Sequence, residues 1–251
     1  MQYTLKKSLG QHFLHDEDIC HRIVESLSPN ATTVLEIGPG GGAITKYLIE
    51  KKFTNYLCVE IDEEKVNYLH KTYPALQGHI IHKDFLHMDI PYEGPFSVIG
   101  NFPYNISSQI VFKVLDWRDQ VTEVVGMFQK EVALRIASKH GSKDYGILSV
   151  LTQVYYDVTY LFDIPATCFT PPPKVVSGLI RLQRNQNPYG IEDYNSFRKF
   201  VKAAFSQRRK TLRNSLKSSF PADKLQEPIF GQRAEQLSIQ AFVDLYQQLK
   251  G

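Results

Sequence analysis

The residues with the clearest chemistry are Asn101, Phe102, Pro103 and Tyr104, which follow an apolar run at 96–100. This run is typical of a buried strand, so the four residues would stand at its end. There the Asn101 amide oxygen and the Phe102 carbonyl can each accept one hydrogen of a planar amine, while the ring of Tyr104 lies on its face. Pro103 favours extended geometry at Phe102 and so helps to aim that carbonyl. The structural alternative is a proline turn with a capping asparagine.

Two apolar runs further upstream end in residues that suit a nucleoside. The run at 34–37 enters a turn with Gly38 and Gly40, where missing side chains let a ligand approach the backbone. The run at 56–59 is followed by Glu60 and Ile61. An acid at this spacing after a glycine turn can accept both hydroxyls of a ribose.

A third run, at 79–82, is followed by Asp84 and Phe85, which could bind the amino group and the face of an adenine. Residues 38–43 formally match the dinucleotide fingerprint Gly-x-Gly-x-x-Gly/Ala, so NAD and S-adenosylmethionine both remain candidates. A glycine turn that only packs a helix on a strand is the third interpretation. Asn-Phe-Pro-Tyr favours methyl transfer from S-adenosylmethionine. The motif can position the amine of a substrate, but it has no strong acid or base for hydride chemistry.

Composition limits the class of protein. The net charge of the 251 residues is only +3, so an interaction with nucleic acid depends on where the charges lie. Three isolated cysteines, Cys20, Cys58 and Cys168, predict buried, reduced thiols in a cytoplasmic protein. No signal peptide or membrane helix is expected. His79 and His82 would point to opposite faces of a strand, so no metal site is predicted.

Strands alternate with helices up to about residue 130, which predicts a parallel sheet. Two later strands, at 148–161 and 175–183, are joined by a connection too short for a crossover helix, so this edge should be antiparallel. A linker is expected at 185–190, between a catalytic domain at 1–184 and a helical domain at 191–251. Helices are expected at 16–27, 44–50, 63–72 and 131–139 and from residue 107, with a fifth strand at 121–128.

The stretch from Ser196 to Lys217 carries eight lysines and arginines and no acid, beside an apolar stripe at helical spacing. A run of charge is usually a solvated helix face. On a base-modifying enzyme, the same face could hold RNA phosphates without reading sequence. The residues predicted to bind RNA are Arg208, Arg209, Lys210 and Arg213, and Lys6, Lys7, Lys139 and Lys143 could extend the surface.

The ordered motifs resemble those of the KsgA family of small-subunit rRNA adenine dimethyltransferases over nearly the whole chain. The resemblance is carried by residues 6–14, 38–43, 101–107, 129–132, 169–175 and 205–216. Two positions depart from the family pattern. His12 stands where the family usually has an asparagine that contacts the cofactor, and Phe102 replaces the usual leucine.

The resemblance implies an α/β fold, a Rossmann-like seven-stranded class I S-adenosylmethionine-dependent methyltransferase domain with a small all-helical C-terminal domain. It further implies a cytoplasmic monomer that dimethylates two adjacent adenosines in the 3′-terminal hairpin of 16S rRNA within a pre-30S particle. Catalysis is then expected from Asn101, Phe102 and Tyr104, with Phe169 against the target adenine opposite the tyrosine. The expected cofactor-binding residues are His12, Leu14, Gly38, Gly40, Glu60, Ile61, Asp84, Phe85 and Asn101.

Two alternatives remain at the level of the sequence. The related large-subunit (23S) rRNA adenine dimethyltransferase of the macrolide-resistance type shares the cofactor motifs, and only segments 169–175 and 207–211 favour the small subunit. A non-catalytic RNA-binding assembly factor could also keep this fold. Such a factor should have lost Asn101 or Tyr104, and both are present.

Overall fold

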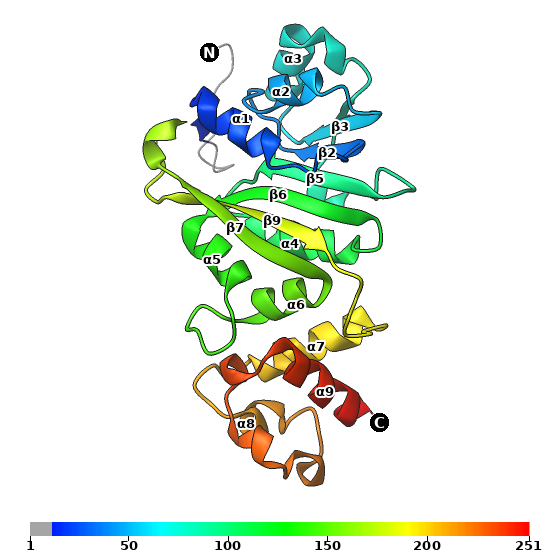
Figure 1. The fold of residues 1–251 in the computed structure, drawn as a ribbon, viewed down its shortest axis with the longest axis vertical. Coiled ribbons are helices and arrows are strands. Elements are labelled where there is room, and N and C mark those ends of the chain that lie inside the picture. Colours follow the sequence, from blue (N-terminus) through cyan, green and yellow to red (C-terminus); the bar gives the residue numbers. More distant parts are fainter. Residues whose placement is uncertain (1–11, 251) are drawn as a thin grey trace. The chain divides into compact units, whose positions relative to one another are not determined.

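Apolar runs rich in β-branched residues form a seven-stranded sheet in the computed structural model, which describes residues 12–250 of the chain (Figure 1). The strand order is β4-β3-β2-β5-β6-β9-β7. Neighbours from β4 to β6 are parallel and β9 is antiparallel to β6, which confirms the predicted parallel sheet with an antiparallel edge. The strands are β2 (Thr33–Ile37), β3 (Asn55–Glu60), β4 (Ile80–His82), β5 (Phe96–Asn101), β6 (Val121–Gln129), β7 (Tyr156–Ile164) and β9 (Ser177–Arg184).

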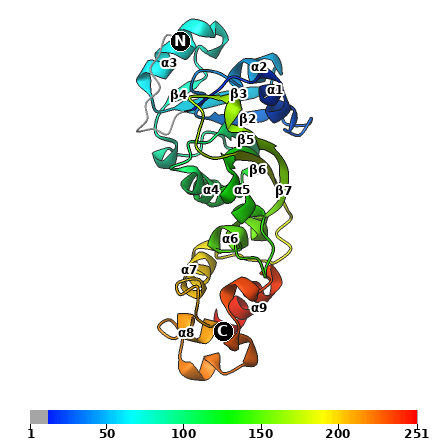
Figure 2. The same ribbon diagram turned by 90° about the vertical axis from the view of Figure 1, so that its left-hand side faces the viewer.

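Helices cover both faces of the sheet, as expected for parallel strands that are buried on both sides. Ile99 of β5 packs in one core with residues of α1 and α2. Phe96 points to the opposite face, where its ring lies 6.3 Å from that of Trp117 at the end of α4. Figure 2 shows α1 and α2 on one side of the strands and α4 on the other. The helices are α1 (Glu17–Glu25), α2 (Thr45–Glu50), α3 (Glu63–Thr72), α4 (Ser107–Asp116) and α5 (Lys130–Ala137).

A second, two-stranded sheet pairs β1 (Phe13–Leu14) with β8 (Phe169–Thr170) in antiparallel register. It joins the start of the chain to a segment more than 150 residues later. Hydrophobicity alone could not predict this pairing, because each strand has only two residues.

The chain forms two compact units. One comprises the chain up to Ala133 together with Val158–Arg184, and the other comprises Leu134–Asp157 together with the chain from Asn185. Residues 134–157 therefore group with the C-terminal helices. The division into domains at 1–184 and 191–251 stays a prediction.

The predicted strand at 148–161 is wrong for its first half, because Ile147–Tyr155 forms helix α6 and only Tyr156–Ile164 forms a strand. Seven of the nine α6 residues are buried. Its polar residues Ser149, Thr152 and Gln153 lie at helical spacing on one face, a pattern that the sequence analysis did not use. The β-branched residues of the run and the strand that follows it directly favoured a single long strand over this helical pattern. In its unit, α6 packs against α7 and α9.

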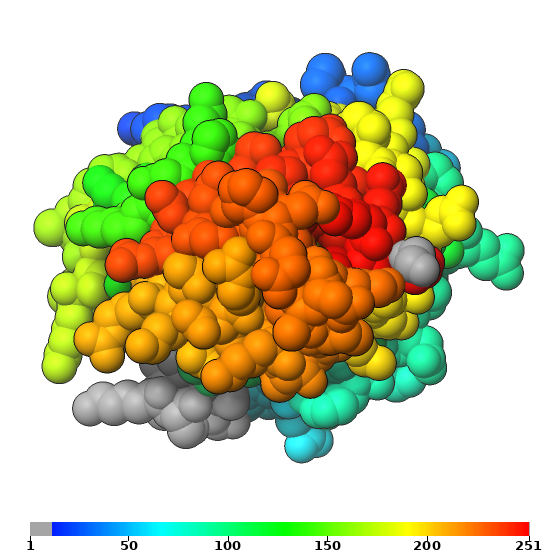
Figure 3. Space-filling view, turned by 90° about the horizontal axis from the view of Figure 1, so that it is seen from below, coloured from blue at the N-terminus to red at the C-terminus, as the bar shows by residue number. Residues whose placement is uncertain are grey.

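The C-terminal unit also contains α7 (Tyr194–Ala204), α8 (Leu212–Leu216) and α9 (Ile239–Lys250). The predicted helical stripe over 196–217 is interrupted by a turn between α7 and α8. The rings of Phe200, Phe205 and Phe242 pack together in the core of this unit. Its later segments, orange to red in Figure 3, form a continuous surface. Within residues 12–250, none of the helices is sufficiently long and apolar to span a bilayer.

Candidate active site

The carboxyl ends of four neighbouring parallel strands meet at one edge of the sheet and form a cavity. At this edge Ile37 of β2 pairs with Val59 of β3, and Glu60 of β3 pairs with His82 of β4. The cavity has a volume of about 220 Å³. A single bound water needs only about 10–15 Å³, so the cavity can take a much larger ligand. Residues at or just beyond the ends of β2, β3, β4 and β5 line it, at the edge where open α/β sheets bind ligands.

The turn after β2 turns its backbone toward the cavity. The φ angles of Gly38 and Gly40 are 69° and 58°, a region that residues with side chains rarely adopt. The N–H of Gly38 donates to the carbonyl of Val59 at 2.9 Å, which ties the turn to β3. Both glycines line the cavity. They give a ligand access to the backbone at the point where the chain leaves β2.

The carboxylate of Glu60 is buried at the end of β3 and accepts three backbone hydrogen bonds. Oε2 accepts from the N–H of Gly40, and Oε1 accepts from the N–H groups of Ile61 and Asp62, all at 3.0 Å. A carboxylate has about four lone-pair positions, so one position on Oε2 remains for a ligand hydroxyl. The predicted contact with both ribose hydroxyls would require the bond from Gly40 to lengthen or be shared.

Asp84 follows β4 and lines the cavity with a half-buried side chain. Its Oδ1 accepts from the N–H of Leu86 at 2.9 Å, and its Oδ2 lies 2.7 Å from Nδ1 of His87. His87 is largely exposed. The local turn therefore holds the Asp84 carboxylate in place at the rim of the cavity.

Two apolar side chains near these acids could contact a flat ring. Phe85 is buried and meets Trp117 edge-on, with 5.3 Å between ring centroids. Ile61 is 51% exposed, although large apolar side chains are usually buried. Both side chains line the cavity. The exposed apolar surface of Ile61 could therefore pack against the face of an adenine ring.

Glu36 lines the cavity too, although the sequence analysis did not assign it to the site. It is buried within β2, where Oε1 accepts from the Thr45 hydroxyl at 2.9 Å and Oε2 accepts from the Tyr56 hydroxyl. Burial raises the pKa of Glu36 to about 7, and the bonds from Tyr56 and Thr45 limit the rise. A carboxylate between the apolar residues Leu35 and Ile37 of a buried strand was the signal that could have identified it.

The Phe102 ring lies against two glycines that are cross-strand partners, Gly100 of β5 and Gly126 of β6. A Cβ at Gly100 or Gly126 would lie 2.8 Å or 2.5 Å from a ring carbon of Phe102. The ring is fully buried in this slot, and the N–H of Phe102 donates to the carbonyl of Met127 at 3.3 Å. The side chain therefore anchors the turn. Phe102 can act on a substrate only through its backbone.

Asn101 ends β5, is half-buried and lines the cavity. Within residues 12–250 its side-chain amide takes part in no hydrogen bond. The amide is therefore available to a ligand, as the predicted contact with an amine requires.

Tyr104 is held at both ends. Its hydroxyl lies 2.6 Å from the Ser177 hydroxyl at the start of β9, and its carbonyl accepts from the Ser107 hydroxyl at 3.2 Å. Burial raises the pKa of Tyr104, and the bond to Ser177 opposes that rise. The ring is therefore neutral and fixed at the cavity wall. The partner Ser177 was not identified from the sequence, because it is 73 residues away along the chain.

Phe169 does not line the cavity. It pairs with Leu14 across β1 and β8, and both side chains are buried in the core on the α1 face. Leu14 does line the cavity, as expected of a cofactor-binding residue. A contact between Phe169 and an adenine would require the phenylalanine ring to be uncovered first.

His12 precedes β1 and lines the cavity. Its Nδ1 lies 2.8 Å from the carbonyl oxygen of Pro171. Its ring stacks on that of Tyr104, with 5.7 Å between centroids and 29° between the planes. The imidazole therefore faces the tyrosine predicted to bind the target base.

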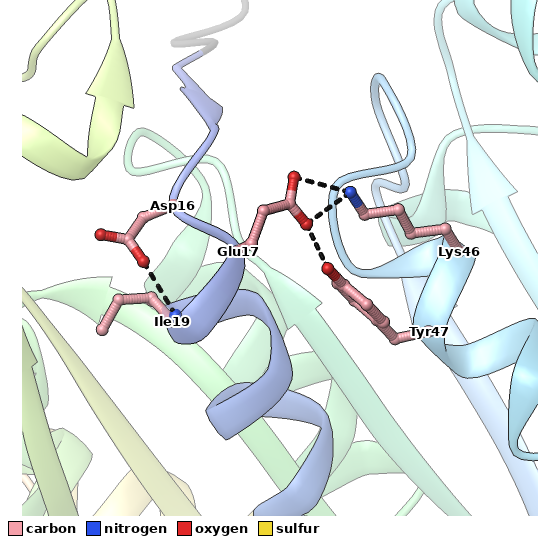
Figure 4. A network of polar contacts seen from close by, with 5 residues as sticks. All are labelled: Asp16, Glu17, Ile19, Lys46 and Tyr47. Carbon is pink, nitrogen blue, oxygen red and sulfur yellow. Dashed lines mark hydrogen bonds and ion pairs between the residues drawn. The ribbon is translucent and has the colours of Figure 1, made fainter.

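Polar contacts fix the helix that follows His12 against the helix that follows the glycine turn (Figure 4). Asp16 caps α1 by accepting from the N–H of Ile19 at 3.0 Å. Glu17 pairs with Lys46 of α2 at 2.6 Å and accepts a hydrogen bond from the Tyr47 hydroxyl. The contacts of Glu17 thus connect α1 and α2, which follow two segments that line the cavity.

The residues predicted to bind RNA lie in the C-terminal unit and differ in their contacts. Arg209 and Lys210 are exposed in the turn after α7, and neither side chain has an ion pair or hydrogen bond within the described part of the chain. Arg208 donates to the carbonyl of Lys143, so the turn lies beside the loop that precedes α6. Both segments belong to the same unit and together present basic side chains.

Arg213 has a structural role that the sequence did not predict. Its Nε donates to the carbonyl of Leu225 at 2.9 Å, and its guanidinium also approaches the next two carbonyls at 3.4 Å. It is therefore less available to phosphates than Arg209 or Lys210. Lys6 and Lys7, the other predicted contributors, lie outside the described residues.

All three cysteines are free and buried, as predicted. His79 and His82 contact the backbone carbonyls of Tyr56 and Ile61. The residues that the structure describes contain no cluster of three His, Cys, Asp or Glu side chains suited to a metal ion.

The chain is similar to known proteins over nearly its whole length. Proteins named ribosomal RNA small subunit methyltransferase A from Cytophaga hutchinsonii and Flavobacterium johnsoniae are each 53% identical to this chain. The alignments cover 98% of it and 97% and 95% of the relatives. The structure of a dimethyladenosine transferase from Plasmodium falciparum has the same fold, with a TM-score of 0.79 at 24% identity over 93% of this chain and 96% of that one. The 23S rRNA methyltransferase ErmE gives 0.72 at 26% identity over 95% and 100%.

These likenesses confirm the predicted class I methyltransferase fold with a helical C-terminal region. The family described as ribosomal RNA adenine dimethylase matches residues 2–250. The match includes the glycine turn, the acids at the strand ends and Asn101–Tyr104, which together line the cavity. The chain belongs to the ribosomal RNA adenine dimethylase family and is an adenine dimethyltransferase of ribosomal RNA.

Proposed function

We propose that the cavity at the ends of β2 to β5 binds S-adenosylmethionine, and that the chain dimethylates two adjacent adenosines in the 3′-terminal hairpin of 16S rRNA. The particle would be a pre-30S subunit, and the enzyme would act as a cytoplasmic monomer. Relatives at 53% identity are named for the small subunit, whereas the likeness to the 23S enzyme is 26%. This difference favours the small-subunit substrate over the large-subunit alternative.

The residues of the cavity fit this cofactor. Gly38 and Gly40 give access to the backbone, Glu60 has a free acceptor position, and Ile61 offers an apolar face. Glu36 adds a buried carboxylate whose ionised form would be favoured by a bound cation. When bound, S-adenosylmethionine supplies a methyl group activated by its sulfonium.

The turn at Asn101 and Phe102 would prepare the acceptor. The exocyclic nitrogen of adenine is a poor nucleophile, because its lone pair is delocalised into the ring. In the first transfer the Asn101 amide oxygen and the Phe102 carbonyl can each accept one amino hydrogen and favour a pyramidal nitrogen with an available lone pair. In the second transfer the methylated nitrogen has one hydrogen left, which one of the two oxygens can accept. Positioning and electrostatic stabilisation of this kind can supply most of the acceleration. The proton can pass to water after attack, so no general base is needed.

The target adenine would have to leave its stack to reach this turn, because pairing hides its amino group. Tyr104, fixed by Ser177 and Ser107, offers a rigid ring to the extruded base. Unstacking costs least in a loop or hairpin end, which agrees with a hairpin substrate. Arg209 and Lys210, with the loop around Lys143, would hold the RNA backbone.

One observation carries the proposal: the free amide of Asn101 lines the same cavity as Gly40 and Glu60. The test is incubation with radiolabelled S-adenosylmethionine and separated, unmethylated ribosomal subunits. Label should appear in dimethyladenosine of the small subunit. Label in the large subunit alone would support the 23S alternative, and no label in either would refute the proposal.

Asn101→Ala tests the role of the turn. Loss of one orienting acceptor should lower kcat by roughly 10²–10³-fold, by analogy with the loss of one oxyanion-hole donor. The Kd of S-adenosylmethionine, measured by calorimetry, should change far less. Asn105→Ala is the matched control, because Asn105 is exposed at the rim of the same cavity. Methylation by Asn101→Ala at the wild-type rate would exclude the proposed role.

A further inference from the structure

The imidazole of His12 occupies a defined place on Tyr104. The ring centroids are 5.7 Å apart and the planes differ by 29°, so the two rings are stacked. A carbonyl oxygen only accepts, so the 2.8 Å contact with Pro171 requires Nδ1 of His12 to carry the hydrogen. One stacked neighbour and one hydrogen bond thus hold the imidazole over the tyrosine.

Tyr104 is the fixed partner of this pair. Its hydroxyl is bonded to Ser177 and its carbonyl to Ser107, at opposite ends of the residue. His12 is held by fewer contacts, because the β1–β8 ladder begins only at Phe13. If the pair separates, the imidazole is therefore the part that moves.

The stacked pair leaves no room for a base. A flat ring between two others needs about 7 Å between the outer planes, since each contact takes about 3.5 Å. The 5.7 Å between the centroids of His12 and Tyr104 is smaller. Phe169, the other predicted neighbour of the adenine, is also covered, with 2% of its surface exposed.

We propose that His12 closes the base-binding face of Tyr104 in the free enzyme and leaves that face when the target adenine is inserted. His12 is then a residue of the adenine subsite that competes with the substrate, in addition to any contact with the cofactor. This inference rests on the proposed function, because it takes Tyr104 as the platform for the base. Removal of the imidazole should favour RNA binding, whereas removal of a substrate contact would weaken it.

Steady-state kinetics with unmethylated small subunits test this competition. We take the stabilisation by the His12–Tyr104 stack to be that of other aromatic pairs. His12→Ala removes this stack and should therefore lower the KM for subunits about two- to tenfold. His12→Asn should act in the same direction, because an amide can reach the Pro171 carbonyl but cannot stack. The Kd of S-adenosylmethionine, measured in parallel, reports separately on any contact of His12 with the cofactor. His15→Ala is the control, since His15 is exposed three residues further on and does not line the cavity.

A spectroscopic test separates this inference from the proposed function. In the wild-type protein the Cε1–H signal of His12 should be shifted upfield by the Tyr104 ring, and Tyr104→Leu should abolish the shift. Addition of an RNA hairpin with two adjacent loop adenosines, with S-adenosylhomocysteine present, should move the His12 signal downfield, as Tyr104→Leu does.

Several results would overturn the role of His12 and leave the methyltransferase standing. One is a KM for subunits that rises or stays constant in His12→Ala while the wild-type enzyme methylates the small subunit. Another is a His12 signal that does not move when the RNA hairpin is added to saturation. A tenfold rise in the cofactor Kd with an unchanged KM for subunits would also overturn it. If the wild-type protein fails to methylate small subunits, the proposed function fails, whatever the His12 signal does.

Discussion

The backbone N–H of Gly40 donates to Oε2 of Glu60 at 3.0 Å, across the ends of two neighbouring strands. The glycine turn after β2 and the acid at the end of β3 are therefore one hydrogen-bonded unit. A ligand hydroxyl that reaches the remaining acceptor position on Glu60 is brought against the exposed backbone of the turn.

Substitution of Glu60 by glutamine should weaken cofactor binding. The amide has one acceptor oxygen for the three N–H groups that the carboxylate now serves, and it has lost the charge. Hydrogen bonds to charged groups are worth about 1.5–3 kcal/mol, so the Kd of S-adenosylmethionine should rise roughly 10- to 150-fold. Calorimetry measures this, and Glu63→Gln, an exposed acid in the first turn of α3, is the control. Equal affinity of both variants and the wild type would contradict the assignment.

The buried Glu36 should make stability depend on pH. Burial raises its pKa from 4.5 to about 7, so the folded state binds the proton more tightly than the unfolded chain. The resulting stabilisation is complete below about pH 4.5 and is lost as the pH rises through about 7. A shift of this size corresponds to about 3 kcal/mol.

Glu36→Gln isolates this effect, because the amide imitates the protonated acid between Thr45 and Tyr56. Urea unfolding of both proteins should show the free energy of unfolding of the wild type falling, relative to the variant, between about pH 4.5 and 7. A difference that stays constant over this range would mean that Glu36 does not titrate in the folded protein.

Neutralisation of Arg209 and Lys210 should weaken RNA binding without a loss of stability. If each holds one phosphate, the double variant with glutamine at both positions should lower the slope of log affinity against log salt by about 1.4–1.8. Arg213→Gln is the matched comparison, since Arg213 is bonded to the carbonyl of Leu225. It should lower the melting temperature and leave the salt slope unchanged. A lower salt slope in Arg213→Gln, with an unchanged slope in the double variant, would place the phosphate contact at Arg213.

Gly126→Ala should disturb the turn at Phe102. The added Cβ would lie 2.5 Å from the Phe102 ring and 2.7 Å from the Phe128 ring, and both rings are fully buried. Overpacking of this kind typically costs about 1–3 kcal/mol. Because the ring anchors the Phe102 carbonyl, kcat should fall as well. Gly94→Ala, with no atom within 4 Å of its Cβ, should change the free energy of unfolding by less than about 0.5 kcal/mol. Wild-type stability and kcat in Gly126→Ala would show that the slot tolerates a methyl group.

The cavity at the strand ends was predictable from the sequence because the residues that line it follow successive strands. Gly38, Glu60, Asp84 and Asn101 each stand at or just after the carboxyl end of a predicted parallel strand, and parallel strands end at the same edge of a sheet. The order of the motifs along the chain was therefore enough to bring them together. The helix-capping role of Asp16 was also predictable, because capping is an interaction between residues close together in the sequence.

Local patterns were insufficient where burial or distant contacts decide. Residues 147–155 form a helix that continues directly into the strand Tyr156–Ile164, so the apolar run of the sequence contains two elements whose boundary no turn residue marks. Arg213 was grouped with Arg209 by charge alone, and only the packing of the C-terminal unit shows it bound to backbone carbonyls. The basic run therefore contains both a structural residue, Arg213, and the exposed side chains of Arg209 and Lys210.

The sequence by itself determined the methyltransferase motifs, their order and the parallel sheet that gathers them, because each follows from local spacing and strand direction. Only the tertiary structure decided the arrangement of the residues proposed to bind the target base. It places His12 on Tyr104, buries Phe169 beside Leu14 and seats Phe102 against Gly100 and Gly126. The pairing of Phe169 with Leu14 joins residues 155 positions apart. These contacts depend on which strands pair and on how closely side chains pack, and neither quantity is encoded in any local pattern.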